Sequence, residues 1–81
     1  MPDNNNFGIS LIKIVEIIRW NKDQDGFDII CENGKHYPIS RSAWPAIEDT
    51  STIIDGNNCI EINGIKLIIS EEQKNIIKKF A

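Results

Sequence analysis

The chain has 81 residues, with 12 acidic and 9 basic side chains and a net charge of −3. This length suits one small domain, which buries only about 60–65% of the surface of its unfolded chain. The hydrophobic content of 41% is sufficient for a core and excludes a chain that is disordered by composition. The acidic balance disfavours non-specific binding to nucleic acid, which requires an excess of Lys and Arg.

The first eight residues are polar and rich in Asn, and we expect a flexible tail followed by a single α+β domain at residues 9–81. Residues 9–20 contain a β-branched run, which favours a strand, but polar residues at every third position also fit a helix. We predict a long strand. The stretch is too short and too charged to span a bilayer and lacks the features of a signal peptide. We therefore expect a cytoplasmic protein that does not bind a membrane.

One pattern occurs twice in the rest of the chain. Asn33-Gly34 and Asn63-Gly64 each lie between apolar runs. This arrangement is a strong hairpin signal, because a type I′ turn needs a positive φ at both central residues. Each second strand ends in a serine, Ser40 or Ser70, whose hydroxyl can accept hydrogen bonds from the first N–H groups of a helix. Each half is therefore predicted to form a hairpin, a serine cap and a helix.

In the first half, residues 27–32 and 35–39 are the predicted strands. Pro38 has no N–H group and should therefore lie at a sheet edge or a strand end. A serine, Ser40 or Ser42, is expected to cap a short helix that ends near residue 49. Opposite His36 in the predicted hairpin lies Cys31.

Residues 49–58 are expected to be a turn-rich connection to the second hairpin. Five apolar residues should share one face of that hairpin: Ile60, Ile62, Ile65, Leu67 and Ile69. Glu61 and Lys66 should face each other on the opposite side. The final helix begins with a capping box at Ser70 and Gln73. The predicted fold is α+β, with a small antiparallel sheet of about five strands, a meander plus a second hairpin, and two short helices.

The polar loop at residues 21–26, followed by Glu32, approximates the ligand spacing of an EF-hand. Asp28 replaces the apolar residue normally found at the eighth position. Turn and strand sequence occupies the place where the second EF-hand helix should begin. We therefore predict that this loop does not bind Ca²⁺ tightly, and we expect no metal site and no cofactor.

The sequence offers little support for catalysis. Cys31 and His36 are expected to pack as cross-strand neighbours and not to act as a nucleophile and its base. Both cysteines, Cys31 and Cys59, are expected to be reduced and buried. The sequence contains no nucleophile elbow, phosphate loop or dinucleotide fingerprint. We predict a protein that is not an enzyme.

Three residues near the end of the first hairpin are candidates for an interaction surface. Tyr37, Arg41 and Trp44 belong to the residue types that dominate the energetics of protein interfaces, and they lie close together in the sequence. In so small a domain, Tyr37 and Trp44 also fit a role in the core. We predict that at least one of the three is exposed and binds a protein partner or a second copy of the chain.

Several segments resemble a family of small bacterial domains of unknown function. They are residues 27–39 with Asn33-Gly34, the helix start Trp44-Pro45-Ala46-Ile47, and residues 65–69 followed by Ser70-Glu71-Glu72. The resemblance covers most of the chain. Such domains are often encoded beside a small toxin-like partner, which implies an antitoxin-like or regulatory role. No catalytic residues are established for the family, so none is carried over.

Residues 9–47 also resemble the C-terminal half of the LytTR DNA-binding domain. The similarity lies in an apolar strand, Arg19-Trp20, Gly26, Asn33-Gly34 and residues 38–42. In that family the Ser-Arg stretch, here Ser40-Arg41, lies at the DNA contact. Residues 50–81 are not explained by this resemblance, the family's N-terminal half has no match, and the net charge is acidic. A minimal DNA-binding regulator is therefore the alternative to a protein-interaction module.

Overall fold

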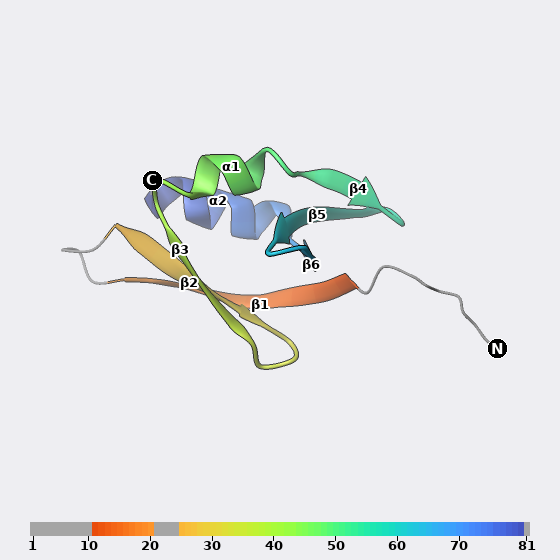
Figure 1. Cartoon of the computed structure of the whole chain (residues 1–81), viewed down its shortest axis with the longest axis horizontal. Coiled ribbons are helices and arrows are strands. Elements are labelled where there is room, and N and C mark those ends of the chain that lie inside the picture. The colour runs from red at the N-terminus through yellow and green to blue at the C-terminus, as the bar shows by residue number, and fades with distance from the viewer. Residues whose placement is uncertain (1–10, 21–24, 81) are drawn as a thin grey trace.

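The computed structural model describes residues 11–20 and 25–80, so the predicted tail at residues 1–8 lies outside the described residues. Figure 1 shows the elements in chain order: β1 (Leu11–Arg19), β2 (Gly26–Cys31), β3 (His36–Ser40), α1 (Trp44–Glu48), β4 (Thr52–Ile54), β5 (Asn57–Ile62), β6 (Ile65–Ile68) and α2 (Glu71–Phe80). The predicted α+β class is confirmed.

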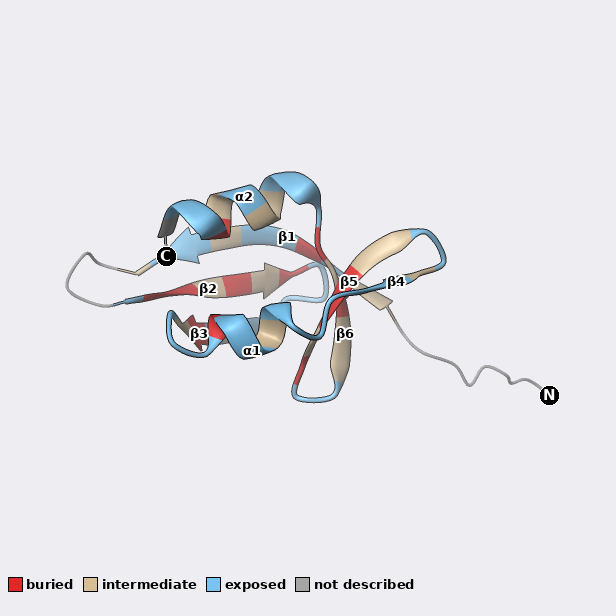
Figure 2. Ribbon diagram, turned by 90° about the horizontal axis from the view of Figure 1, so that it is seen from above, coloured by how far each residue is buried: buried red, intermediate tan, exposed pale blue. Residues whose placement is uncertain are grey.

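The strands form one sheet in the order β3-β2-β1-β6-β5-β4. Four neighbouring pairs are antiparallel, and β1 and β6 are parallel. The described sheet is therefore mixed and has six strands, where we predicted about five antiparallel ones. Both helices lie on the same side of β1, β2 and β3, and the twist of the sheet turns β4, β5 and β6 across these strands (Figures 1 and 2).

Within the predicted strand at residues 9–20, the structure confirms a strand over Leu11–Arg19, and a β-bulge explains why its pattern also resembled a helix. Ile14 pairs with Cys31 and Glu16 pairs with Ile30, so Val15 has no partner in β2. The extra residue shifts the alternation of side chains by one position. Ile14 therefore lies in the core with Ile17 packed against it, although an uninterrupted strand would place them on opposite faces.

The first hairpin has a different turn from the predicted one. Gly34 has a φ of 85°, but Asn33 does not have a positive φ, so this is not a type I′ turn. The Cys31 N–H donates to the Lys35 carbonyl oxygen at 3.0 Å, which leaves a three-residue loop. His36 consequently pairs with Ile30, and the prediction that it lies opposite Cys31 is wrong. A shift of one residue in the pairing moves a side chain to the other face of the sheet. His36 is therefore exposed, whereas Cys31 is buried.

Two other turns have the type I′ geometry. Asn63 and Gly64 have φ values of 52° and 79°, as predicted, and they join β5 to β6. Asp55 and Gly56 have φ values of 50° and 80° and join β4 to β5. The predicted turn-rich connection at residues 49–58 does contain turns, at residues 49–50 and 55–56, but the prediction missed β4 and the start of β5, which form a hairpin there. Asp-Gly is itself a hairpin signal, but it follows an apolar run of only two residues.

The second hairpin has the predicted faces. Its apolar side is buried at Ile60, Ile62, Leu67 and Ile69, and Ile65 is half-buried at the turn. On the other side Lys66 Nζ lies 2.6 Å from Glu61 Oε1. The buried residues of β2 and β3 continue the same core, together with Trp44 of α1 and Ile77 of α2 (Figure 2).

The two helices begin differently. In α2 the predicted capping box is confirmed, because the Gln73 N–H donates to Ser70 Oγ at 3.0 Å and the Ser70 N–H donates to Gln73 Oε1 at 2.9 Å. Helix α1 has Ala43 at its N-cap, without a side-chain hydrogen bond. The prediction that Ser40 or Ser42 occupies that cap is wrong. The Ser40 hydroxyl instead accepts from the Ala43 N–H at 3.2 Å, within the turn before the helix.

Trp20 lies against Gly26 on the face of the sheet opposite the core. A Cβ atom at Gly26 would meet the Trp20 ring and would lie 2.6 Å from the carbonyl oxygen of Ile39. The Trp20 indole N–H donates to Asp28 Oδ1 at 3.3 Å, which fixes the ring across the strand. Gly26 is therefore required by close packing.

We predict that Gly26→Ala lowers the free energy of unfolding by about 2 kcal/mol or more, because backbone and ring atoms would overlap the new methyl group. Gly34→Ala is the control, since nothing lies within 4 Å of its Cβ position and only the positive φ is strained, at about 1 kcal/mol. Urea unfolding measures both changes. Equal losses would show that Trp20 moves aside without cost.

A second prediction concerns the contact between α2 and β1. The Gln73 side chain completes the capping box and also donates from Nε2 to the Ile14 carbonyl oxygen at 2.9 Å. Gln73→Ala should lower the free energy of unfolding by about 1–2 kcal/mol. Asn75→Ala is the matched control on the exposed side of α2 and should cause no loss, because Ala favours helix. Equal stability of both variants in urea would contradict the role given to Gln73.

Candidate functional site

The predicted residues Tyr37, Arg41 and Trp44 do not form one exposed surface. Trp44 is only 5% exposed and packs edge-on against Phe27, with ring centroids 5.8 Å apart. Tyr37 is half-buried, and its hydroxyl is buried without a hydrogen-bond partner. The Arg41 side chain is 55% exposed and lies 3.7 Å from the Asp25 carboxylate. Arg41 thus meets the expectation that at least one residue is exposed, and its binding to a partner stays a prediction.

The cysteines have the surroundings of structural residues. Cys31 and Cys59 are free and buried. Burial raises the pKa of the Cys31 thiol, and the nearby Glu32 carboxylate raises it further. The thiol therefore stays protonated and weakly nucleophilic at neutral pH. His36 lies on the opposite face of the hairpin, so it cannot act as a base for Cys31.

The loop compared with an EF-hand is described only in part, because residues 21–24 lie outside the described residues. Two of its predicted ligands have other partners. Asp25 forms the ion pair with Arg41, and Glu32 Oε2 accepts from the Lys13 N–H at 2.9 Å. Across residues 11–20 and 25–80, no group of three or more His, Cys, Asp or Glu residues could hold a metal ion. No helix in this part of the chain is long and apolar enough to cross a membrane.

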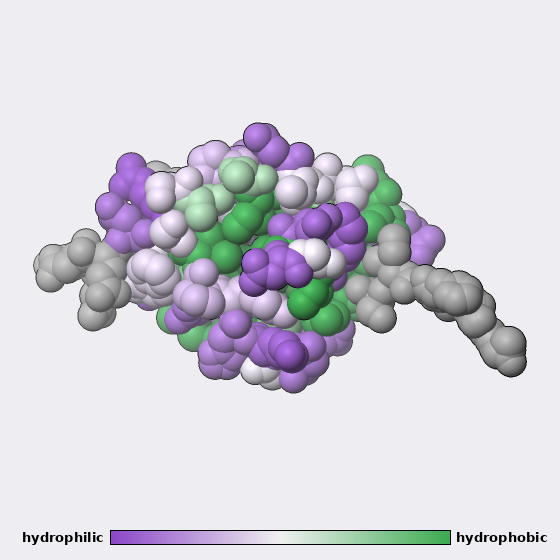
Figure 3. Space-filling view, viewed as in Figure 1, coloured by the Kyte–Doolittle hydropathy of each residue, from purple (hydrophilic) through white to green (hydrophobic). Residues whose placement is uncertain are grey.

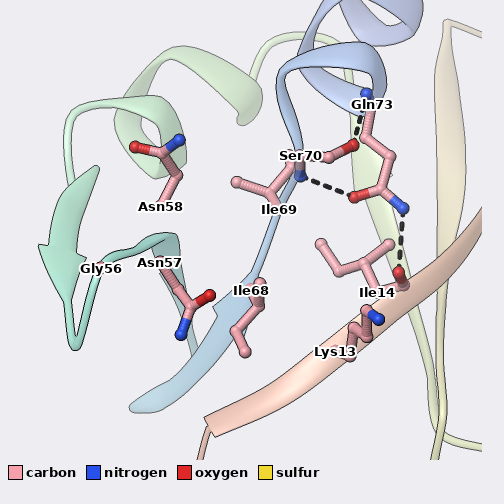
Figure 4. A pocket seen from close by; sticks show the side chains of 9 residues that line it. All are labelled: Lys13, Ile14, Gly56, Asn57, Asn58, Ile68, Ile69, Ser70 and Gln73. Atoms are coloured by element: carbon pink, nitrogen blue, oxygen red, sulfur yellow. Dashed lines mark hydrogen bonds between the residues drawn. The ribbon is translucent and has the colours of Figure 1, made fainter.

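A hollow of about 370 Å³ lies where β1, β5, β6 and the start of α2 meet (Figure 4). Its lining consists of Lys13, Ile14, Gly56, Asn57, Asn58, Ile68, Ile69, Ser70 and Gln73. The backbone N–H and the side chain of Ser70 and both ends of the Gln73 amide take part in the helix cap and the bond to Ile14. The polar groups of Ser70 and Gln73 in this hollow therefore hold the fold together.

The strand edge beside this hollow is open. β6 pairs with β1 only along Leu11–Lys13, whereas β2 pairs with β1 from Ile14 to Arg19. Beyond Lys13 no described strand lies on the β6 side of β1, and α2 runs beside it there (Figure 2). A groove of about 290 Å³ separates them, lined by Val15, Glu16, Ile17, Ser70, Glu72, Gln73 and Ile76.

The backbone of β1 presents hydrogen-bonding groups on this open side. The Trp20 N–H donates to the Gly26 carbonyl oxygen, so alternate residues before it also face β2. The N–H and C=O groups of Ile17, at an intervening position, point away from β2. Nearer the bulge, the Ile14 carbonyl oxygen already accepts from the side chain of Gln73. At this edge, the Ile14 carbonyl oxygen is therefore already bonded to α2, and the N–H and C=O groups of Ile17 lie further along the same edge.

Two large apolar side chains beside this edge are exposed to solvent. Val15 at the bulge is 54% exposed and Ile18 is 43% exposed. The sequence reasoning missed this surface. The sequence does carry one signal for an open edge: the apolar run of β1 is longer than the apolar run before Ser70. A nine-residue strand cannot be fully paired by a four-residue neighbour.

The chain was compared with family models, curated proteins and solved structures, and none of them matches it.

Proposed function

We propose that this chain is a non-enzymatic protein-interaction module that works in the cytoplasm. The observation that carries the proposal is the exposure of Val15 and Ile18 beside the open edge of β1. Unpaired backbone groups on a strand edge, next to apolar side chains, are a template for pairing with another chain. In a complex, the partner would pair with the unpaired backbone groups and bury the apolar side chains.

The outermost edges of the sheet are better protected against such contact. In β3, residues 37 and 39 make the backbone hydrogen bonds to β2, so Pro38 between them faces the outer edge. That edge therefore lacks an N–H group at this position. As predicted, Pro38 lies at an edge, where it blocks strand addition. At the other end of the sheet β4 has only three residues. The open side of β1 has neither protection.

Exposed apolar side chains alone would not distinguish this surface. Figure 3 shows hydrophobic side chains reaching the surface among polar ones on the face that it views. Scattered exposure of this kind is ordinary in small proteins. Apolar exposure and an unpaired strand edge also meet at Ile53 of β4, but that strand has only three residues, whereas β1 has nine.

The resemblance to the small bacterial family suggests a class of partner. A small toxin-like protein would be held by this surface, and the chain would act as an antitoxin-like or regulatory subunit. This assignment fits a fold whose described cysteines and single histidine form no catalytic arrangement.

The DNA-binding alternative is favoured by one observation. Arg41 is exposed at the position that the LytTR resemblance places at DNA. The adjacent Asp25 carboxylate and the net charge of −3 oppose contact with phosphates. We therefore rank DNA binding second.

The interaction proposal predicts the effect of a charge at the exposed apolar positions. The tagged full chain, Val15→Asp and Ile18→Asp would be purified from its own cells, and the co-purifying proteins quantified by mass spectrometry. Each variant should retain about tenfold less partner, because a buried interface disfavours an unpaired carboxylate.

The matched control is Ile53→Asp on β4, where the side chain is 70% exposed but lies far from β1 in the sheet order. It should retain the partner. Circular dichroism and thermal unfolding should show that all three variants remain folded. A partner set that is unchanged by both β1 substitutions would reject this surface.

A separate measurement decides the DNA alternative. Fluorescence anisotropy of labelled duplex DNA should show no salt-dependent binding by the wild-type chain. DNA binding that falls steeply with salt and disappears in Arg41→Glu would replace the protein-interaction proposal.

A further inference from the structure

We infer that the groove between β1 and α2 binds an extended, positively charged peptide segment of a partner protein, which adds to the open edge of β1 as a short strand. The inference rests on the proposed function and deepens it, because it specifies the conformation and the charge of the bound segment. Three observations carry it: the place where β6 ends, the hydrogen bond of Gln73, and the charges at the groove.

The groove lies in line with β6. This strand pairs with Leu11–Lys13 and ends at Ile68, after which the chain rises into α2 at Glu71. The position beside β1 that β6 would occupy if it were longer is therefore left to the groove, whose lining includes Val15, Glu16 and Ile17. An added strand would continue the line of β6 along the second half of β1.

Gln73 shows how such a strand would be held. Its Nε2 donates to the Ile14 carbonyl oxygen, as a backbone N–H of a neighbouring strand would do (Figure 4). The N–H and C=O groups of Ile17 point to the same side of β1 and are the next ones available to a guest. Main-chain bonds to an exposed strand edge supply affinity for an extended peptide, and alternate side chains supply specificity.

The helix favours a peptide over a second copy of the chain. α2 lies beside β1 on the side away from β2 (Figure 2). A second copy that paired through its own β1 would bring its own α2 to the same side, where the two helices would compete for space. An extended segment has no such bulk and fits between a strand and a helix.

The charges at the groove select the side chains of the guest. Val15, Ile17 and Ile76 supply an apolar floor and wall, and Glu16 and Glu72 are exposed beside them. Among the described residues, the lining includes Glu16 and Glu72 and no Lys, Arg or His. Complementary charge favours Lys or Arg on the guest, between residues that place apolar side chains in the groove.

The test uses the purified full chain and labelled heptapeptide probes, followed by fluorescence anisotropy. The first probe alternates Val with Lys between terminal Thr residues, and the second has Glu in place of Lys. The Lys probe should bind at least about tenfold more tightly, because both carboxylates attract one probe and repel the other. Equal binding of the two probes would overturn the charge assignment.

Two further Lys probes separate strand addition from simple contact. Each carries N-methyl groups on one of the two alternating sets of backbone nitrogens. Only one set faces β1 in an added strand, so one probe should lose about tenfold or more in affinity and the other should bind nearly as well as the parent. If both methylated probes bind like the parent, strand addition is excluded.

Charge reversal on the protein locates the site. Glu16→Lys combined with Glu72→Lys should reverse the preference, so that the Glu probe binds more tightly than the Lys probe. The control is Glu48→Lys combined with Asp49→Lys at the end of α1, where both carboxylates are exposed and the change in charge is the same. The control should keep the original preference, and its reversal as well would assign the effect to net charge.

The outcomes distinguish this inference from the proposed function. A chain that binds no probe but loses its cellular partner in Val15→Asp overturns the inference and leaves the interaction function intact. A purified chain that is dimeric, with the Ile17 amide protected from hydrogen exchange without peptide, identifies a second copy as the occupant and also overturns it. If the chain binds no probe and both Val15→Asp and Ile18→Asp retain the partner, the inference and the proposed function are both rejected.

Discussion

β1 is the strand on which the rest of the structure depends, because it belongs to both halves of the sheet. Its first three residues pair in parallel with β6, and the residues from Ile14 onward pair with β2. The bulge at Val15 lies within the part of β1 that pairs with β2 and shifts the alternation of side chains. Without that shift, Ile17 would point away from the core and Glu16 would point toward it, so the apolar face of β1 would be interrupted.

The same sharing of β1 creates the candidate site. A four-residue β6 cannot pair with the whole of a nine-residue strand, so the sheet leaves part of β1 without a neighbour. α2 covers the gap only in part, where the Gln73 side chain bonds to the Ile14 carbonyl oxygen. The open edge is a consequence of the unequal strand lengths, and the helix next to it turns the edge into a groove.

The sequence predicted the elements best where local chemistry fixes them. The type I′ turn at Asn63-Gly64, the capping box at Ser70 and Gln73, and the faces of the second hairpin depend on neighbouring residues, and the structure has all of them. The same dipeptide at Asn33-Gly34 adopted another turn. A three-residue loop is compatible with the same two residues, and it places Ile39 opposite the buried Phe27, so burial of Ile39 and exposure of His36 decided between the registers.

By itself, the sequence determined the α+β class, the order of most elements and the residues that form the apolar faces, because these follow from turn chemistry, capping and periodicity. The tertiary structure decided the parallel pairing of β1 with β6, the bulge at Val15 and the burial of Trp44 against Phe27. These features arise from contacts between segments that are far apart in the chain. The open edge of β1 belongs to this second group, since an edge exists only once the neighbouring strands are in place.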